Sequence, residues 1–225
     1  MNNKELLLAS INLQKTERPA VMLLSGGVWA NNRLGLSLLD SFDIHPQTAT
    51  EHIIKTNELV KSDLVWAAAG CNNLALRGIG AKTTFGKIGA AASVDEPLIR
   101  AAEDVLKLNV NNMEDDPGIQ SSLETTRILK DKIGSDTLIG ISSWGPLTLA
   151  GLLLGTEEFM IMSIRQKDAV NEILKFTRQI VIKYWSLFIE AGAELVSQAE
   201  PSASCDMISP KQFEKMALPH PSRFH

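Results

Sequence analysis

The chain has 225 residues, of which 44% are hydrophobic and 21% charged, and its formal net charge is −4. This balance is typical of an ordinary globular protein, and we expect one domain over residues 1–225. The negative charge and the lack of a lysine- or arginine-rich block argue against nucleic acid or an anionic membrane as partner. The aromatic content of 5% is too low for a base-stacking platform.

The cysteines and the amino-terminal segment indicate the compartment. Cys71 and Cys205 are the two cysteines and do not make a disulfide framework, which fits a reducing cytoplasm. Residues 1–14 are polar and amphipathic and do not read as a secretion signal. The longest apolar run, 147–154, is far shorter than the ~20 residues of a membrane-spanning helix. We therefore expect a cytoplasmic protein with no membrane partner.

The first part of the chain predicts a helix, a strand and a glycine turn. Apolar residues at helical spacing predict a helix over residues 4–13, and a continuous apolar run over 20–24 predicts a buried strand. Ser25, Gly26 and Gly27 follow this strand. Paired glycines after a buried strand allow unusual backbone angles or close approach of a ligand, and a plain turn is an equal alternative.

The remaining chain alternates between strands and helices. Further apolar runs of strand length include residues 63–69, 137–142 and 194–198, and we count about five convincing strands along the chain. Helical patterns occupy residues 34–42, 46–61, 97–108, 117–133, 147–154 and 168–191. Residues 109–118 are polar and predict a surface loop. Continuous apolar strands alternating with helices predict an α/β fold with a parallel sheet covered on both faces.

Two features favour a barrel over an open sheet. No dinucleotide-binding glycine fingerprint follows the first strand, and helical hairpins lie between the strands. A complete (β/α)8 barrel typically has ~250 residues and eight strand–helix units. The chain is therefore predicted to form about the first five or six units of an incomplete TIM barrel.

The loop after the predicted strand 194–198 carries the densest group of reactive side chains. Its strand end and turn contain Gln198, Glu200, Cys205 and Asp206. Catalytic residues of parallel α/β proteins occupy such loops. Glu200 and Asp206 have an alternative role in loop solvation and in capping the helix that Ser209 and Pro210 open. Cys205 is a lone thiol, more typical of a packing residue than of a ligand.

Two segments resemble the uroporphyrinogen decarboxylase superfamily. They are residues 140–155 (GISSWGPLTLAGLLLG) and 191–219 (AGAELVSQAEPSASCDMISPKQFEKMALP). The second is most similar to the corrinoid-dependent, methylcobalamin:coenzyme M methyltransferase-like branch, whose loop has the form ADP-x-AS-x-D-x-ISP. The order of elements matches along most of the chain. The resemblance implies a TIM barrel and offers two activities.

The first implied activity is methyl transfer. In that branch zinc activates a thiol, whose thiolate attacks the methyl group of methylcobalamin or of a corrinoid protein. The resemblance makes a corrinoid protein and a small coenzyme M-like thiol the expected partners. With this activity we expect the catalytic side chains to be Asp63, Glu200 and Asp206. The substrate would be bound at the barrel mouth by Gln198 and by walls formed by Trp144 and the turn of Ser25, Gly26 and Gly27.

The zinc that the resemblance implies lacks its ligands in this sequence. The branch's ligands resemble His-x-Cys on a later strand and a further cysteine, and no His-x-Cys occurs here. His220 and His225 lie in a proline-broken tail with no acid or thiol at ligand spacing. We therefore assign no metal ligand in this chain.

The second implied activity is uroporphyrinogen decarboxylation in porphyrin biosynthesis. In those enzymes an aspartate after the second strand contacts the pyrrole nitrogens, and Asp63 falls close to it. Their arginine motif, RQAGR, should lie near residues 24–28, where this chain reads LSGGV. A guanidinium binds carboxylates as Ser and Gly cannot, and Arg33 is a displaced substitute. The missing motif argues against this activity.

The sequence looks like a truncated family member. Either the gene is cut short after Leu218, or a second polypeptide completes the barrel, and association of identical chains is a further option. The tail PHPSRFH has no amphipathic pattern, which favours truncation. An incomplete barrel exposes sheet edges and apolar interior. A third hypothesis is therefore an inactive remnant or a binding module that holds a corrinoid protein or a partner chain.

Overall fold

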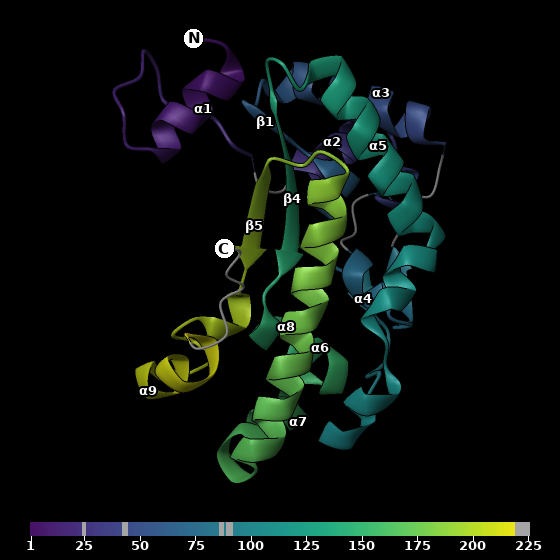
Figure 1. The fold of residues 1–225 in the computed structure, drawn as a ribbon, viewed down its shortest axis with the longest axis vertical. Coiled ribbons are helices and arrows are strands. Elements are labelled where there is room, and N and C mark those ends of the chain that lie inside the picture. The colour runs from purple at the N-terminus through teal and green to yellow at the C-terminus, as the bar shows by residue number, and fades with distance from the viewer. Residues whose placement is uncertain (24–25, 42–44, 86–87, 89–91, 219–225) are drawn as a thin grey trace.

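A three-stranded parallel sheet forms the centre of the molecule in the computed structural model (Figure 1). The structure describes residues 1–225 except 24–25, 42–44, 86–87, 89–91 and 219–225. The strands, in the spatial order β1–β4–β5, are β1 (Leu64–Trp66), β4 (Leu138–Trp144) and β5 (Leu195–Ala199). All three point the same way, so their carboxyl ends share one edge of the sheet.

Each of these strands follows a long helix. The helices are α3 (Pro46–Val60), α5 (Pro117–Ile133) and α8 (Lys167–Glu190). Val65 of β1 and Ile139 of β4 pack against Ile53 of α3 and Leu129 of α5. On the same outer face the indole of Trp185 in α8 donates to Ser143 Oγ at 2.9 Å. This parallel sheet with helices on its outer face is the arrangement expected for part of a β/α barrel.

The inner face of the sheet is closed at its amino end by α1 (Asn3–Ile11). Leu7 of α1 packs with Leu64, Trp66 and Leu138, which the parallel register places on one face. The helix starts at a capping box, in which Asn2 and Glu5 each accept from the backbone of the other. The first predicted helix is therefore confirmed, and it fills the base of the sheet.

The largest apolar core lies between the sheet and the helix hairpin α6 (Pro146–Leu154), α7 (Thr156–Arg165) and α8. Tyr184, Phe159 and Phe188 are among its largest fully buried side chains. Gly155 joins α6 to α7 at φ +94°, a backbone angle that L side chains rarely adopt. No single helix of the described residues is long and apolar enough to cross a membrane; α6 and α7 reach that length and composition only as a pair, bent by 108°.

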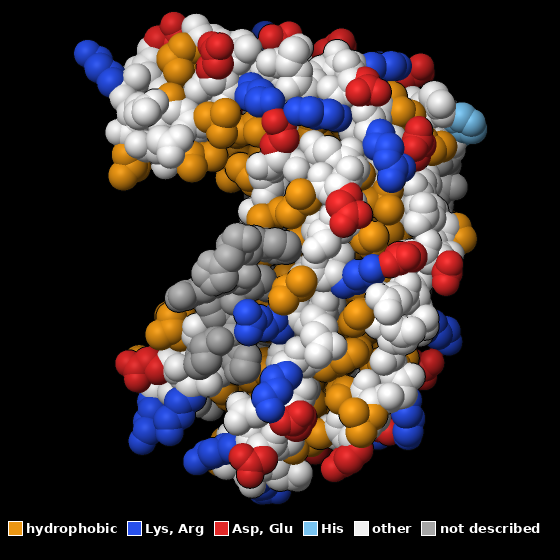
Figure 2. Space-filling view, viewed as in Figure 1, with side chains coloured by type: hydrophobic (Ala, Val, Ile, Leu, Met, Phe, Trp, Pro, Cys, Tyr) orange, Lys and Arg blue, Asp and Glu red, His pale blue; other side chains and the backbone are white. Residues whose placement is uncertain are grey.

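Shorter elements connect these helices and strands. They are α2 (Gly26–Arg33), η1 (Leu39–Ser41), η2 (Ala67–Gly70), α4 (Leu74–Gly78), β2 (Thr83–Phe85), β3 (Ala92–Val94), η3 (Ala102–Lys107), η4 (Val110–Asp115), η5 (Pro201–Ala203), α9 (Pro210–Gln212) and η6 (Phe213–Ala217). Strands β2 and β3 pair antiparallel as a separate hairpin. In the described part of the chain β5 has β4 as its only strand neighbour. Figure 2 shows the molecule hollowed on the side where α1 and β5 lie, with hydrophobic side chains along the upper wall of the hollow.

Four predictions about local structure are wrong. The helix predicted over residues 34–42 is not formed, because the described part of this segment holds only the three-residue 3-10 helix η1. The strand predicted over residues 20–24 is not formed in its described part, 20–23. The Asp63 N–H donates to the Val21 carbonyl at 2.8 Å, but no strand ladder follows. The predicted helix over 97–108 is a short 3-10 helix, η3, and the predicted surface loop over 109–118 contains η4. In η4 the side chain of Met113 is completely buried, so this polar segment is anchored to the core.

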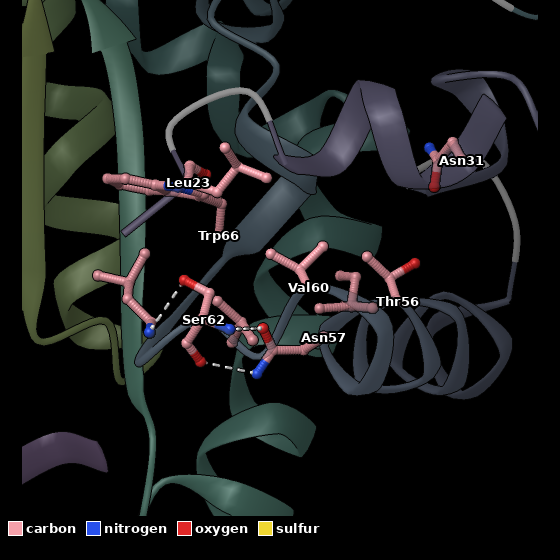
Figure 3. Close-up of a pocket in the computed structure, with 10 residues that line it drawn as sticks. Leu23, Asn31, Thr56, Asn57, Val60, Ser62 and Trp66 are labelled. Carbon is pink, nitrogen blue, oxygen red and sulfur yellow. Dashed lines mark hydrogen bonds between the residues drawn. The ribbon is translucent and has the colours of Figure 1, made fainter. Parts of the chain in front are cut away.

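A small cavity of about 30 Å³ lies where β1 meets α2 and α3 (Figure 3). Asn57 closes one side: its amide donates to the Ser62 carbonyl at 3.0 Å, and its Oδ1 accepts from the Ser62 N–H at 3.2 Å. The indole of Trp66 donates to the Leu23 carbonyl at 3.0 Å. A cavity of this size holds about one water molecule and no substrate.

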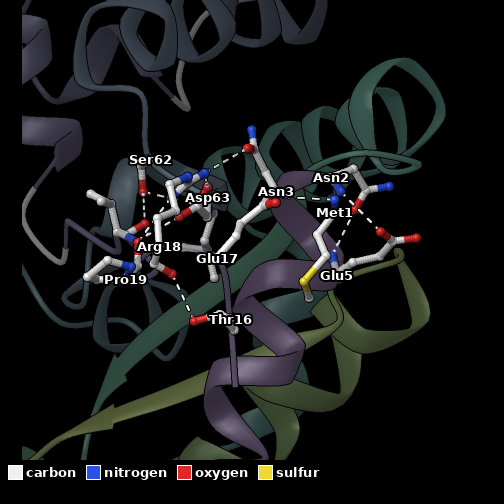
Figure 4. Close-up of polar contacts among 12 residues, drawn as sticks. Met1, Asn2, Asn3, Glu5, Thr16, Glu17, Arg18, Pro19, Ser62 and Asp63 are labelled. Carbon is white, nitrogen blue, oxygen red and sulfur yellow. Dashed lines mark hydrogen bonds and ion pairs between the residues drawn. The ribbon is translucent and has the colours of Figure 1, made fainter. Parts of the chain in front are cut away.

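An ion pair between the buried Asp63 and the exposed Arg18 fixes the amino end of β1 (Figure 4). Asp63 is fully buried, and Arg18 donates to both of its oxygens, at 2.8 and 2.6 Å. The Val21 N–H donates to Asp63 Oδ2 at 2.7 Å. Burial raises the pKa of Asp63, but the hydrogen bonds from Arg18 and Val21 and the Arg18 charge outweigh it, so the net pKa lies below its usual range.

We predict that Asp63→Asn lowers the free energy of unfolding by on the order of 2 kcal/mol at pH 7, because it removes a buried charged acceptor from Arg18. Since the pKa of Asp63 is lowered in the folded state, its carboxylate stabilises the fold above the unfolded pKa of about 4 and loses that contribution as the pH falls through the folded value. Urea titrations from pH 7 to pH 3 measure both effects. The exposed Asp131→Asn is the control, and equal stability of the two variants would contradict a structural role for Asp63.

Candidate functional site

The carboxyl ends of β1, β4 and β5 define the candidate site, which we call the mouth. The register pairs Trp144 at the end of β4 with Ala199 at the end of β5. The Gly145 N–H donates to the Ala199 carbonyl at 2.7 Å, so the two strands stay together to their last residues. The loops that follow these ends therefore meet at one edge, as they do in barrel enzymes.

Glu200, the first residue after β5, is fixed by the amino end of α6. Its Oε1 accepts from the Thr148 N–H at 2.6 Å and from the Thr148 hydroxyl at 2.5 Å, and its Oε2 accepts from the Leu147 N–H at 3.1 Å. The first N–H groups of a helix have no partner within the helix and carry partial positive charge. Glu200 is therefore a cap for α6, supplied from a neighbouring strand.

The local environment of Glu200 has opposing effects on its pKa. Burial raises the pKa, and the hydrogen bonds from Thr148 and Leu147 lower it, with a net pKa above the usual range. The alternative of loop solvation does not fit this half-buried carboxylate. The alternative that Glu200 helps to cap the helix opened by Ser209 is wrong: Glu200 caps α6, and Ser209 and Gln212 cap α9.

Gly145 makes room for the Glu200 carboxylate. A Cβ atom at residue 145 would collide with Glu200 Oε2 and lie 2.7 Å from Gln198 Nε2. The backbone of Gly145, at φ −79° and ψ 168°, suits any residue. The position therefore requires glycine for space and not for conformation.

Trp144 connects the mouth to the β2–β3 hairpin. Its indole donates to Asn73 Oδ1 at 2.5 Å, and the Asn73 amide donates to the Ala92 carbonyl at 2.9 Å. Asn73 is buried and Trp144 is half-buried, so one edge of the indole is held while part of the ring stays accessible. Trp144 therefore lies at the carboxyl end of β4 with a fixed, partly accessible ring.

The remaining predicted residues are spread around this edge. The register puts Gln198 on the face of Ser143, which α8 covers, and Trp144 on the opposite face. Asp206 is exposed in the turn before Ser209. The neighbouring Cys205 is also exposed, so it is not the packing residue that the sequence suggested. Ser209 caps α9 as predicted, in a capping box with Gln212.

The predicted glycine turn forms the start of a helix. Gly26 and Gly27 are the first residues of α2, which packs against η2 directly after β1, and Ser25 lies outside the described residues. Asp63 precedes β1, whereas a mouth residue would follow it. The structure therefore does not bring Asp63 together with Glu200, because the two stand at opposite ends of the sheet.

Asn73 and Thr148 are site residues that the sequence did not single out. Both are polar, buried and bonded to a predicted residue, Asn73 to Trp144 and Thr148 to Glu200. The signal available for Thr148 was its place in the first turn of a helix that opens with Pro146, where a side chain often contacts a cap. Asn73 offered only its position after a strand.

The donor set does not fit the zinc that the family resemblance implies. Within the described residues no three His, Cys, Asp or Glu side chains gather as a metal site. Cys71 is buried, and burial raises the pKa of its thiol to about 12, which disfavours the thiolate that zinc binds. Cys205 is on the surface. No step of a mechanism is therefore assigned to zinc in this chain.

We predict that Gly145→Ala displaces the Glu200 carboxylate and destabilises the protein by about 1–3 kcal/mol, as overpacking usually does. The free energy of unfolding in urea is the measurement. Gly151→Ala within α6, the helix that Gly145 precedes, is the control, because its Cβ meets nothing closer than 3.4 Å and alanine favours the helix.

The double variant Gly145→Ala, Glu200→Ala tests whether the destabilisation comes from the contact between the new Cβ and the Glu200 carboxylate. Because Glu200→Ala removes the atoms that the new Cβ meets, adding Gly145→Ala to it should have little further effect. Full additivity of the two changes would show that Gly145 matters for another reason.

Known proteins resemble this chain over part or most of its length. A family model described as Uroporphyrinogen decarboxylase (URO-D) matches residues 2–225. "Methylcobamide:CoM methyltransferase MtaA" of Methanosarcina barkeri is 35% identical over 97 residues, 43% of this chain and 29% of that protein. "Methylcobamide:CoM methyltransferase MtbA" of Methanosarcina mazei is 31% identical over 126 residues, 52% of this chain and 37% of that protein.

A solved structure shows the same fold. The structure titled "methyltransferase from Methanosarcina mazei" aligns with a TM-score of 0.84 and 24% sequence identity, over 96% of this chain and 64% of that chain. The predicted α/β barrel of the uroporphyrinogen decarboxylase type is thus confirmed for the part that is present, and the alignments with MtaA and MtbA span 29% and 37% of those proteins. The family match covers nearly every residue, and the chain belongs to the uroporphyrinogen decarboxylase family.

Proposed function

We propose that this chain takes part in transferring a methyl group from a methylated corrinoid to a small thiol of the coenzyme M type. The observation that carries the proposal is its similarity to proteins named methylcobamide:CoM methyltransferase, at 35% identity over 97 residues. The loop between Ala199 and Pro210, which resembles that branch in sequence, lies at the mouth. Both point to the corrinoid branch of the family.

The reaction is a nucleophilic substitution at the methyl carbon. The thiolate sulfur forms the new S–C bond, the Co–C bond breaks, and its electron pair stays on cobalt. The products are a methyl thioether and the reduced corrinoid. The protein has to hold a large flat macrocycle and a small thiolate in line, which is a matter of orientation.

Trp144 is the residue that we assign to the macrocycle. A half-buried indole whose N–H is bound by Asn73 presents a fixed apolar surface, and such surfaces suit flat ligands. Asp206 and Gln198 remain predicted contacts, Asp206 on the exposed turn of the same loop and Gln198 at the end of β5.

Glu200 acts in this proposal as a positioning residue. Three donors of α6 already occupy its carboxylate, so it is not free to take a proton from the thiol. It holds the loop after β5 against the start of α6, and this loop carries Asp206. Moving Glu200 would therefore move the mouth without removing a reacting group.

The test is turnover of free methylcobalamin with coenzyme M by the purified chain. Loss of the methylcobalamin absorbance and appearance of the methyl thioether by mass spectrometry are the measurements. We expect Trp144→Phe to weaken methylcobalamin binding by about fivefold, because it frees the ring from Asn73 at about 1 kcal/mol for a lost hydrogen bond.

The matched control is Trp185→Phe, which removes an indole hydrogen bond on the opposite face of the same strand. It should leave methylcobalamin affinity unchanged. Decarboxylation of uroporphyrinogen without any methyl transfer would contradict the proposal and favour the other activity of the family. No turnover of either substrate would favour the binding-module hypothesis.

A further inference from the structure

A groove of about 750 Å³ opens between the α7–α8 junction and the segment formed by α9 and η6. We call it the lysine groove. Its lining residues come from both sides: Ser163, Ile164, Lys167, Val170, Asn171, Ser209, Lys211, Gln212, Glu214, Lys215 and Met216. Residues nearly fifty positions apart in sequence thus form one surface.

The groove has an apolar floor and an exposed apolar rim. Val170 and Met216 are 2% and 7% exposed and form the floor, while Ile164 is 71% exposed. Phe213, 41% exposed, stands next to Gln212 in the chain. The surface can therefore bury apolar side chains of a ligand as well as bind its charges.

The charge of the groove is positive in a chain whose net charge is −4. Lys167, Lys211 and Lys215 face one acid, Glu214, and all three lysines are exposed. None of them forms an ion pair with another described residue, whereas Lys4 and Lys130 are both paired with Glu194. Three lysines that face a single acid, and that form no ion pair with it or with any other described residue, attract an anionic partner.

The position of the groove places it beside the mouth. Segment α9 follows directly on the loop that carries Glu200 and Asp206, with Ser209 as its cap. Figure 1 places α9 and the start of α8 toward the end of the molecule to which the strands point, and Figure 2 shows Lys and Arg side chains there, with Asp and Glu among them. A molecule bound in the groove would therefore adjoin the mouth.

We propose that the lysine groove docks an acidic, partly apolar segment of a protein partner. Lysines above an apolar floor complement a segment whose faces are acidic and apolar, such as an amphipathic helix. Nucleic acid fits less well, since the chain is acidic and the apolar floor offers nothing to a phosphate backbone. A protein that delivers the methylated corrinoid suits this position, and to that extent the inference rests on the proposed function.

The probe is a fluorescein-labelled peptide about fifteen residues long, with glutamates on one helical face and leucines on the other. Binding is measured by fluorescence anisotropy at low and high salt. We expect the triple variant Lys167→Glu, Lys211→Glu, Lys215→Glu to lose at least about tenfold in affinity, and salt to weaken wild-type binding.

The control carries the same change of net charge elsewhere. Lys15→Glu, Lys55→Glu and Lys132→Glu are exposed positions outside the groove and should change affinity by less than about twofold if the effect is local. An equal loss in both triple variants would overturn the proposal. Tighter binding of a single-stranded oligonucleotide than of the peptide would overturn it as well.

Turnover of free methylcobalamin separates this inference from the proposed function, because a free corrinoid needs no docking. The groove variant should retain wild-type turnover of free methylcobalamin while losing the peptide. Turnover without peptide binding by the wild type would reject the groove and keep the function. Peptide binding that the groove variant loses, in a chain without turnover, would keep the groove and reject the function.

Discussion

The geometry of the candidate site depends on the contact between the Glu200 carboxylate and the amino end of α6. Three hydrogen bonds from Leu147 and Thr148 connect the end of one strand to the helix that follows the neighbouring strand. Gly145 lies between them and has no side chain to interfere. The positive end of a helix thus accommodates a carboxylate that burial alone would disfavour. This contact fixes the start of the loop after β5 against the first turn of α6.

Much of the fold could be predicted because its long elements have strong periodicity. The helix over residues 117–133 and the strand in 137–142 were found nearly as they stand, since an amphipathic face or a continuous apolar run identifies them without tertiary information. The failures have a common cause. Residues 20–23 are apolar enough for a strand, but their backbone makes contacts to Asp63 and Trp66 in place of a ladder. Met113 buries a segment whose polar neighbours predicted a loop.

The site was predictable in its location and less so in its residues. The rule that loops after parallel strands carry function found Trp144 and Glu200, and both lie at the mouth. It did not lead to Asp63, which the family resemblance alone assigned to the site, although the strand was already predicted to begin at residue 63; the structure keeps Asp63 at the amino end of β1. Asn73 could not be found, since its partner Trp144 is 71 residues away in sequence. Contacts of this range become visible only in the folded chain.

The one-residue connections between α6, α7 and α8 fix the distance between the mouth and the lysine groove. Gly155 alone joins α6 to α7, and Gln166 alone joins α7 to α8. The path from the Glu200 cap to the lysine groove therefore runs through packed helices without a flexible loop, along about 13 Å of α6 and then down α7. Because these connections are short, the distance between the lysine groove and the mouth is fixed. A partner bound in the groove would therefore lie at a constant distance from the mouth. A side chain at Gly155 would strain its left-handed backbone and change that spacing, even though Gly155 touches neither surface.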